Sequence, residues 1–585
     1  MPAIADATNA SERNKLIAAL REAHPEIHAE FISALRQADG ERAFLSNSGR
    51  YPLCGRGRVN TYAVFAEADR SLLGPAGRLG VILPAGIATD ATTQYFFKNL
   101  VSSKTLASLL HFENEAFIFP SVHHAFKFCL LTITGTTTPT STAEFAFYAR
   151  HVEDLARPDA VFTLTPEEII LLNPNTGTCP VFRSRRDAEI AIGIYKRVPV
   201  LIDEGNANSN PWGIYFRQGL FNMANDSNLF RTGDQLKSVG AELEGNIWYA
   251  GARTWLPLYE AKMAHHFNHR WGDYATKEAS DRGSALLDVP EDQLADPSFA
   301  PQPRYWVDGN EVESQLPGWP QDWLVGFRDI TNTTNERTAI IAIIPRFGVG
   351  HTLPLMFPAV DPTHVASLVA NLTSFVFDYE TRQKLGGTHL TYFILKQLPV
   401  LSPDRYDQQV PWNPTITLNR WLAPRVLELT YTAWDMRGFA VDLGDNAPPF
   451  RLDPERRPLM RAELDAAFFH LYGLDRDEAD YIMGTFPVVK ERDEKRFGEY
   501  RTKRLILEAY DAMAQAIETG EPFVSSLAPP PGKGPRHPAR AAMPARVETD
   551  RKTVRLGSTG CGHNPDLGGG TPECQVCAFN HRRTS

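Results

Sequence analysis

One short stretch near the start of the chain restricts the fold more than any other, because it alternates helical and strand patterns in a fixed order. Residues 60–73 (NTYAVFAEADRSLL) place apolar side chains at helical spacing behind Asn60, a residue suited to capping a helix. The run RLGVILP at 78–84 is almost entirely apolar and is bounded by glycine and proline. That pattern is typical of a strand buried on both faces of a parallel sheet, so we expect an α/β sheet here.

The alternation continues over the next fifty residues. Residues 92–103 (TTQYFFKNLVSS) have helical spacing, and TLASLLHF at 105–112 has the pattern of a second strand. AFKFCLLTITG at 125–135 follows after a loop with no helix between, so we expect it to pair antiparallel with the strand before it. The predicted order is helix, strand, helix, strand and reversed strand.

Length and composition limit the class of protein. The 585 residues exceed one hydrophobic core, and we expect roughly three to five domains. No apolar run approaches the ~20 residues that a membrane span needs, and the N-terminus lacks a secretory signal pattern. The net charge of −9 gives no overall basic signature for nucleic acid, so any DNA contact must come from local patches. We expect a cytoplasmic protein with no membrane partner.

The predicted order of elements is that of the C-terminal half of a class I methyltransferase sheet. Two segments, GRVNTYAVFAEADRSLLGPAGRLGVILP and HFENEAFIFPSVHHAFKFCLLTITG, carry a closer likeness. They resemble the second half of the catalytic domain of adenine-specific (N6) DNA methyltransferases from restriction-modification and phage-defence systems. The resemblance implies a partial class I methyltransferase sheet, S-adenosylmethionine as the methyl donor, and double-stranded DNA as a partner.

The front half of that family's catalytic domain has no counterpart in the sequence. In the family it carries a glycine-rich S-adenosylmethionine loop and an Asn/Asp-Pro-Pro-Tyr/Phe motif that grips the flipped adenine. NPNT at Asn173 lacks the second proline, NAPPF at Asn446 interrupts the motif, and GRGR at 55–58 has no strand before it. We therefore assign no catalytic residue and leave the cofactor-binding residues unknown. The chain is expected to be N-terminally truncated or one part of a split enzyme.

The resemblance extends downstream to about residue 515. Residues 170–203 resemble the link that follows the methyltransferase region, 255–271 and 323–400 resemble the target-recognition domain, and 456–513 resemble the helical C-terminal region. The residue patterns agree, since 338–358 favours strands and 455–515 favours helices. We expect an α/β fold with a mixed, β-rich target-recognition domain and a helical C-terminal region. The predicted domains are 1–150 (rear half of the catalytic domain), 151–240 (connector), 241–405 (target recognition), 406–520 (helical region), 521–556 (basic linker rich in proline and alanine) and 557–585 (zinc-binding tail).

Cationic and aromatic side chains gather in the window from Arg253 to Trp271. This mixture suits phosphate contact and base stacking, although a solvated face over buried aromatics has the same pattern. The predicted DNA-binding residues are Arg253, Tyr259, Lys262, His269 and Arg270.

Two alternative functions remain open at this point. The chain could be a non-catalytic DNA-specificity subunit of a split methyltransferase or restriction complex. It could also be a metal-dependent nuclease, because Glu260 and Lys262 form the E-x-K tripeptide in which a carboxylate holds Mg²⁺ and a lysine polarises water. The Pro-Asp partner of that motif would have to come from Pro158 and Asp159, a hundred residues away.

The C-terminal end has a different composition from the rest of the chain. Residues 525–555 are rich in proline and alanine and basic, which predicts a flexible linker that could track phosphates. Beyond it, Cys561-x-His563 and Cys574-x-x-Cys577 have the spacing of a tetrahedral Zn²⁺ site, with His581 as a substitute for His563. The zinc would be structural. The other three cysteines are scattered singly, which does not suggest a disulfide framework.

Overall fold

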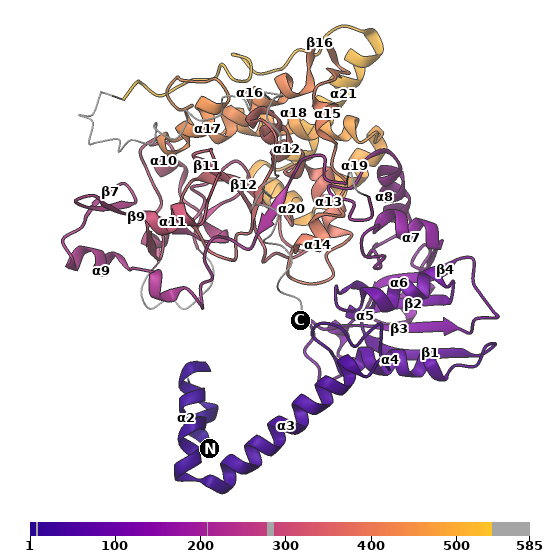
Figure 1. Ribbon diagram of the computed structural model, residues 1–585. Coiled ribbons are helices and arrows are strands. Elements are labelled where there is room, and N and C mark those ends of the chain that lie inside the picture. The colour runs from indigo at the N-terminus through magenta and orange to yellow at the C-terminus, as the bar shows by residue number, and fades with distance from the viewer. Residues whose placement is uncertain (8–9, 207–208, 278–285, 541–585) are drawn as a thin grey trace, which may run out of the picture. The chain divides into compact units, whose positions relative to one another are not determined.

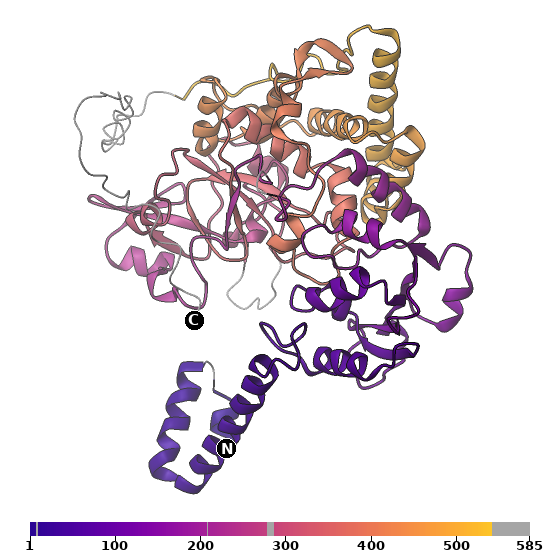
Figure 2. The same ribbon diagram turned by 45° about the vertical axis from the view of Figure 1, so that its right-hand side comes forward.

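The structure is a computed structural model that describes residues 1–7, 10–206, 209–277 and 286–540. Residues 1–537 form one compact unit. The chain begins with helices α1 (Pro2–Ala5), α2 (Ala10–Ala23) and α3 (Pro25–Asn47), and α2 packs against α3 (Figures 1 and 2). No residue of α3 is buried. None of the helices in the described ranges is long and apolar enough to cross a membrane.

A five-stranded sheet follows, in the order β1-β3-β2-β4-β5. Its strands are β1 (Arg78–Pro84), β2 (Leu106–Glu113), β3 (Lys127–Thr134), β4 (Ala143–Ala149) and β5 (Phe162–Leu164). Strand β3 runs antiparallel to both β1 and β2, while β2 and β4 are parallel. The predicted antiparallel pairing of the last two strands is therefore confirmed. The reversed strand also lies between β1 and β2, which the sequence pattern did not indicate.

Three helices accompany the first two strands of this sheet. They are α4 (Thr61–Leu72), which packs against β1, and α5 (Gly86–Thr89) and α6 (Gln94–Ser102). Their apolar side chains share a core with Leu83, Cys129 and Leu131 of the sheet. Asn60 does occupy the N-cap position of α4, but its side chain makes no capping hydrogen bond.

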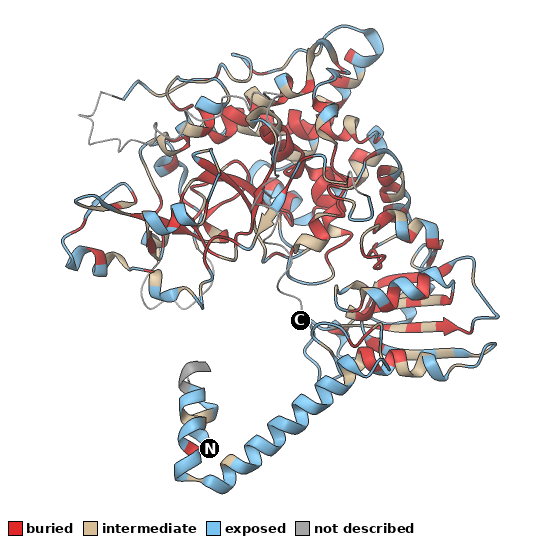
Figure 3. Cartoon of the chain, in the orientation of Figure 1, coloured by how far each residue is buried: buried red, intermediate tan, exposed pale blue. Residues whose placement is uncertain are grey.

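The expectation for the run RLGVILP is wrong in two respects, its burial and its parallel pairing, because among the described strands β1 pairs with β3, which is antiparallel to it. It forms β1 over the predicted residues, but only Leu83 is buried, and Ile82 is 57% exposed. The exposed residues alternate along the strand, so one face of β1 is left uncovered while α4 packs against the strand. Figure 3 shows the contrast between this exposed strand and the buried strands in the middle of the chain.

The turn η2 (Val152–Ala156) lies between β4 and β5, and the sheet is followed by α7 (Pro166–Leu172) and α8 (Arg185–Arg197). Thr165 caps α7 in a reciprocal arrangement with Glu168, and Ser184 caps α8. Side-chain oxygens at these positions satisfy backbone N–H groups that have no partner inside the helix, so both helix starts are specified locally.

The middle of the chain is rich in short strands that form two sheets. One has the order β10-β9-β8-β7 with β13 added to β9, and the other has the order β12-β11-β14-β6. The strands are β6 (Tyr215–Arg217), β7 (Glu242–Glu244), β8 (Ile247–Ala250), β9 (Arg253–Tyr259), β10 (Trp306–Asp308), β11 (Trp323–Phe327), β12 (Ile341–Pro345), β13 (Gly348–Val349) and β14 (Leu355–Phe357). Short helical elements connect them: η3 (Ser227–Leu229), α9 (Gly233–Ser238), η4 (Ala261–Met263), η5 (Tyr274–Thr276), α10 (Glu291–Leu294) and α11 (Gly309–Ser314). The predicted strand content of 338–358 is confirmed by β12, β13 and β14.

The remainder of the described chain is mainly helical. Its elements are α12 (Pro362–Leu372), α13 (Phe375–Arg382), α14 (Tyr392–Leu395), α15 (Pro403–Tyr406), the hairpin β15 (Gln409–Val410) and β16 (Asn413–Thr417), α16 (Leu418–Thr430), η6 (Trp434–Met436), α17 (Arg437–Asp442), α18 (Arg456–Leu471), α19 (Arg476–Gly484), α20 (Pro487–Phe497) and α21 (Arg501–Thr519). The helical prediction for 455–515 is confirmed by α18 to α21.

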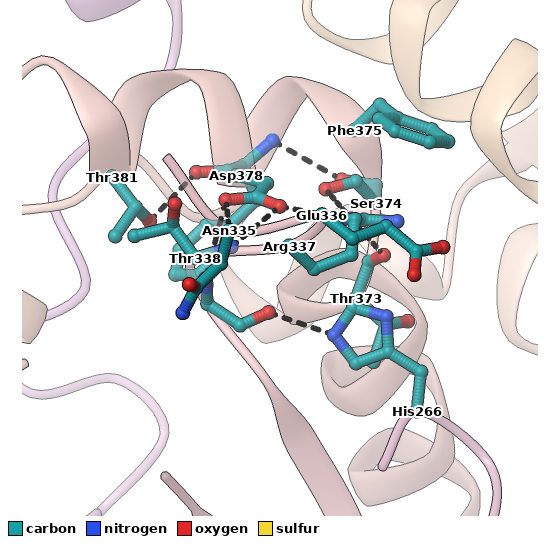
Figure 4. A network of polar contacts seen from close by, with 12 residues as sticks. His266, Asn335, Glu336, Arg337, Thr338, Thr373, Ser374, Phe375, Asp378 and Thr381 are labelled. Atoms are coloured by element: carbon teal, nitrogen blue, oxygen red, sulfur yellow. Dashed lines mark hydrogen bonds and ion pairs between the residues drawn. The ribbon is translucent and has the colours of Figure 1, made fainter. Parts of the chain in front are cut away.

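A buried ionic network ties the residues before β12 to helix α13 (Figure 4). Arg337 donates to the Asp378 carboxylate at 2.6 Å and to the carbonyl oxygens of Thr373 and Ser374. Asp378 also accepts the backbone N–H groups of Thr338 and Ala339. Both charged side chains are almost completely excluded from solvent, so each is compensated by the other and by backbone groups.

The prediction of a flexible basic linker from residue 525 is wrong for its first part. Residues up to His537 pack on the protein: Gly532 donates its N–H to Glu428, and Arg536 pairs with Asp445. Leu527 is buried. These contacts satisfy the charges and backbone groups that would otherwise be solvated. The rest of the predicted linker, from residue 541, and the predicted zinc ligands Cys561, His563, Cys574 and Cys577 lie outside the described residues.

Candidate DNA interface

The window from Arg253 to Trp271 starts on β9, the strand that β8 and β10 flank in their sheet. Its burial changes along its length, because the first residue lies at the surface and the last three residues of β9 are buried. The window then turns through η4 into the protein interior. Only part of it can therefore face DNA.

Arg253 is the predicted contact residue that lies most clearly at the surface. Its side chain is 66% exposed, its guanidinium lies 5.0 Å from the centre of the Trp255 ring, and it pairs with Asp308 at 2.9 Å. Stacking on an aromatic ring holds a guanidinium in a fixed orientation without covering its edge. Arg253 is placed to contact a phosphate or a base.

Lys262 is less accessible and belongs to a small cluster. Its ammonium lies 3.9 Å from Glu260 and 5.0 Å from the ring centre of Tyr274, whose hydroxyl donates to Glu260 at 2.7 Å. Burial lowers the pKa of Lys262, although Glu260 acts in the opposite direction. Within the ranges that the structure describes, no group of three or more histidine, cysteine or acidic side chains is placed to hold a metal ion.

Three predicted contact residues are buried, and this corrects the expectation that they face DNA. Tyr259 donates its hydroxyl to the carbonyl of His269, and the His269 ring meets Asp435 at 2.8 Å. Arg270 is fully buried, with its guanidinium donating to carbonyl oxygens of Leu294, Asp296, Phe299 and Thr432. Carbonyl oxygens satisfy the two terminal nitrogens of this guanidinium, while its buried Nε has no hydrogen-bond partner among the described residues. These side chains hold together segments that are distant in sequence.

A groove that sequence reasoning missed lies beside Arg253. It has a volume of about 440 Å³ and is lined by Arg231, Gln235, Leu236, Ser238, Val239, Ala250, Arg253 and Trp255. Helix α9 forms one side, and its start is fixed by Thr232, which exchanges side-chain hydrogen bonds with Gln235. The guanidinium groups of Arg231 and Arg253, together with the apolar and aromatic side chains that line the groove, suit a phosphate with its attached sugar or base. The signal available in the sequence was the capping box in RTGDQ, which places Arg231 next to a helix start.

The second candidate surface is the loop between β2 and β3, at the carboxyl end of β2. Asn114 is buried, and its side chain bonds the backbone of Phe119 in both directions and the carbonyl of Val122. This anchors a loop whose large apolar side chains are exposed: Phe117, Ile118, Phe119, Val122 and Phe126. Exposed aromatic groups on an organised loop are unusual unless they meet a partner or a ligand.

Positive charges lie near the same edge of the sheet. Tyr148, the second-last residue of β4, has a left-handed backbone conformation with φ of 59°. The centre of its ring lies 4.2 Å from the Arg183 guanidinium and 5.1 Å from the Lys127 ammonium. Burial, followed by the charge of Lys127, lowers the pKa of the neighbouring His111 to about 3, so this imidazole is neutral. In open α/β sheets, ligands bind outside the carboxyl ends of the parallel strands. This edge therefore has the position of a ligand site, where the cations Lys127 and Arg183 lie with the carboxylate of Glu113 nearby.

The structure does not provide a fit for S-adenosylmethionine in the one glycine-rich candidate. GRGR at 55–58 lies in turns between α3 and α4 with no strand before it. A side chain at Gly55 would collide with the backbone oxygens of Leu45 and Tyr51, so that glycine is explained by packing. The degenerate motifs are structural too, because Asn173 binds the Thr178 carbonyl and Lys384, and Phe450 is fully buried.

Comparison with known proteins gives a limited result. No protein family profile and no curated protein matches the chain. Among solved structures, the chain is similar to the type IIG restriction endonuclease BpuSI, with 11% identity, 82% of this chain and 52% of that chain covered, and a TM-score of 0.27. It is also similar to the type IIL restriction-modification enzyme MmeI in complex with DNA, with 11% identity, 77% and 55% coverage, and a TM-score of 0.37.

The structural neighbours are thus restriction-modification enzymes, and the chain spans about half of their length. Both TM-scores lie below 0.5, so neither match decides an activity or a cofactor.

Proposed function

We propose that this chain recognises double-stranded DNA as part of an adenine-N6 DNA methyltransferase of a restriction-modification or phage-defence system, and that alone it does not transfer a methyl group. The observation that carries the proposal is the strand order β1-β3-β2, in which a reversed strand separates two strands of like direction. That order agrees with the sequence resemblance of residues 57–84 and 111–135 to the rear of such a catalytic domain.

DNA recognition is assigned to the groove between α9 and β9. Arg231 and Arg253 are exposed there, whereas the other cations of the predicted window are largely enclosed. Lys262 does not line this groove, and with a side chain that is 30% exposed it is proposed as a separate third contact. Tyr259, His269 and Arg270 act indirectly, by holding β9 and its neighbours in place.

Salt dependence of DNA binding tests this assignment. Each phosphate contact that is removed should reduce the slope of log affinity against log salt by about one unit. Arg231→Ala and Arg253→Ala are therefore expected to reduce the slope by about two together. Arg476→Ala, which removes an exposed arginine from α19, is the matched control and should leave the slope unchanged. Equal slopes for the double variant and the control would contradict the groove assignment.

The second candidate function is a non-catalytic DNA-specificity subunit whose catalytic half is a separate chain. It is favoured by the sequence, because the 585 residues contain neither the glycine-rich cofactor loop nor the Asn/Asp-Pro-Pro-Tyr/Phe motif. The nuclease alternative has less support, since Glu260 is engaged by Tyr274 and Lys262. We further propose a structural zinc at Cys561, His563, Cys574 and Cys577, on the spacing of these residues alone.

A further inference from the structure

One arginine of the helical region differs from its neighbours in having no partner. Arg457 of α18 donates to the carbonyl oxygens of Leu429 and Phe267, at 2.7 and 3.3 Å. Arg461 lies one turn further along the same face of α18, and none of the described residues forms a hydrogen bond or an ion pair with its side chain. Enclosed guanidinium groups are normally satisfied by oxygen atoms. Arg461 is partly accessible to solvent, so its donors can be reached by a ligand.

Further positive charges gather around Arg461. Burial lowers the pKa of its guanidinium, and the charges of Arg337 and Arg492 lower this pKa further. Burial also lowers the pKa of His265 well below its usual range, and the charges of Arg328 and Arg461 act in the same direction. These arginines come from the connection between β11 and β12 and from helices α18 and α20. The fold therefore brings together cations that are far apart in the sequence.

Two carboxylates near Arg461 are engaged by other groups. Asp465 accepts the backbone N–H of Phe375 at 2.7 Å, and Glu336 pairs with Arg492 at 2.5 Å. Both carboxylates raise the pKa of Arg461, but neither forms an ion pair with it. The side chain of Arg492 is 54% exposed, so its other donors face solvent. An anion from solution can therefore reach both guanidinium groups.

The chemistry of these donors favours a phosphate group. A guanidinium presents its N–H groups in a planar fork that matches the oxygens of phosphate, and such charge-assisted hydrogen bonds are stronger than neutral ones. Phosphate also has more acceptor oxygens than a carboxylate, so a single group can be shared between two guanidinium groups from different helices.

We propose that Arg461 and Arg492 bind a phosphate group, at a site separate from the groove that contains Arg231 and Arg253. The phosphate belongs either to the backbone of DNA or to a small molecule. In the first case the inference rests on the proposed function and adds a phosphate contact to it. In the second case the site is independent of DNA.

Titration of the full chain with inorganic phosphate, at constant ionic strength set with chloride, is the first arm of the test. Arg461→Gln removes the charge and keeps much of the side-chain length, and it should weaken phosphate binding by about tenfold or more. It should leave the urea midpoint unchanged, because Arg461 has no partner among the described residues to lose. Arg492→Gln tests the same site from an exposed residue. The matched control is Arg420→Gln, at an exposed arginine of α16.

The salt dependence of DNA binding, measured on the same variants, is the second arm. Each lost phosphate contact should reduce the slope of log affinity against log salt by about one unit. A lower slope in Arg461→Gln than in Arg420→Gln assigns the phosphate to DNA. Weaker binding of inorganic phosphate at an unchanged slope assigns it to a small molecule. Equal behaviour of these two variants in both arms would overturn the proposal.

The same measurements separate this site from the DNA groove. Arg231→Ala and Arg253→Ala should lower the salt slope and leave the titration with inorganic phosphate unchanged. If only these groove variants have an effect, DNA recognition by the groove stands and the Arg461 site is overturned. If only Arg461→Gln and Arg492→Gln have an effect, the Arg461 site stands and the groove assignment fails.

Discussion

Strands β1 and β12 are both short apolar runs, RLGVILP and IAIIP, yet they differ in burial. Every residue of β12 is buried, whereas Leu83 is the one buried residue of β1 (Figure 3). The amino-acid composition of the two runs does not explain the difference. Strand β12 is also the edge of its sheet, but α12 and η6 pack against it and bury both of its faces, whereas α4 packs against β1 while the alternate residues Arg78, Gly80, Ile82 and Pro84 stay exposed.

The difference teaches that an apolar run specifies a strand, and that its neighbours specify its burial. Exposed apolar side chains on β12 would be unfavourable, because α12 and η6 already cover that part of the sheet. On β1 the same exposure marks a surface that is suited to a partner.

The largest effect is expected in the closed part, at the network before β12. Asp378→Ala leaves Arg337 buried without its carboxylate, which should reduce the free energy of unfolding by about 3–5 kcal/mol. Glu189→Ala, which breaks an exposed pair with Arg185, should cost less than about 1 kcal/mol. Urea unfolding of both variants measures the difference. Similar losses of unfolding free energy in the two variants would show that the Arg337–Asp378 network does not stabilise the buried region around β12.

Removing apolar volume from the two strands should give the next largest contrast. Ile343 of β12 is 2% exposed, so Ile343→Ala should cost about 2–5 kcal/mol through lost burial and a cavity. Ile82→Ala on β1 should change stability by no more than about 0.5 kcal/mol, because the side chain is largely in water already. Thermal or urea unfolding compares them, and a loss at Ile82 as large as that at Ile343 would place β1 in the core.

Arginine substitutions should separate the surface groove from the interior behind it. Arg270→Ala leaves several buried carbonyl oxygens without a donor and should cost about 1–3 kcal/mol. Arg253→Ala should leave stability within about 0.5 kcal/mol of the parent, while it weakens DNA binding. Unfolding and DNA titration are measured on each variant. If Arg270→Ala changed the salt slope of a fully folded protein, direct DNA contact by Arg270 would be restored as an explanation.

The smallest effect on the main unit is expected from removing the proposed zinc. Protein never exposed to chelator should contain about one zinc, since Cys561, His563, Cys574 and Cys577 supply four ligands. Chelation should leave the unfolding of residues 1–537 unchanged, because these residues form a compact unit of their own. Elemental analysis giving less than about half an equivalent would count against the four-ligand site.

Much of the fold was accessible from the sequence because its elements are specified locally. The periodicity of apolar residues located α4, β1, β2 and β3 to within about two residues. The loop between β2 and β3 has no helical spacing, which indicated that these two strands pair antiparallel. The insertion of β3 between β1 and β2 was not accessible, since it depends on contacts between residues far apart. Burial along β1 was mispredicted for the same reason.

The sequence predicted only part of the candidate site, because Arg253 was among the predicted contact residues and Arg231 was not. Charge and aromatic content directed attention to residues 253–271, and Arg253 is indeed exposed there. The same cationic and aromatic stretch contains Tyr259, His269 and Arg270. These residues are enclosed by segments such as 294–299 and 432–435. Arg231 lies outside the window and meets Arg253 only because α9 packs beside β9 in space. A linear window cannot separate a cation that faces solvent from one that satisfies buried carbonyls.

Methyl transfer on bound DNA tests the central claim most directly. The purified chain is mixed with duplex DNA and S-adenosylmethionine labelled in its methyl group, at a salt concentration where the DNA is bound. We predict binding without incorporation of label into adenine. Incorporation at the roughly 1 per second typical of enzymes, or even at a hundredth of that rate, would contradict the account.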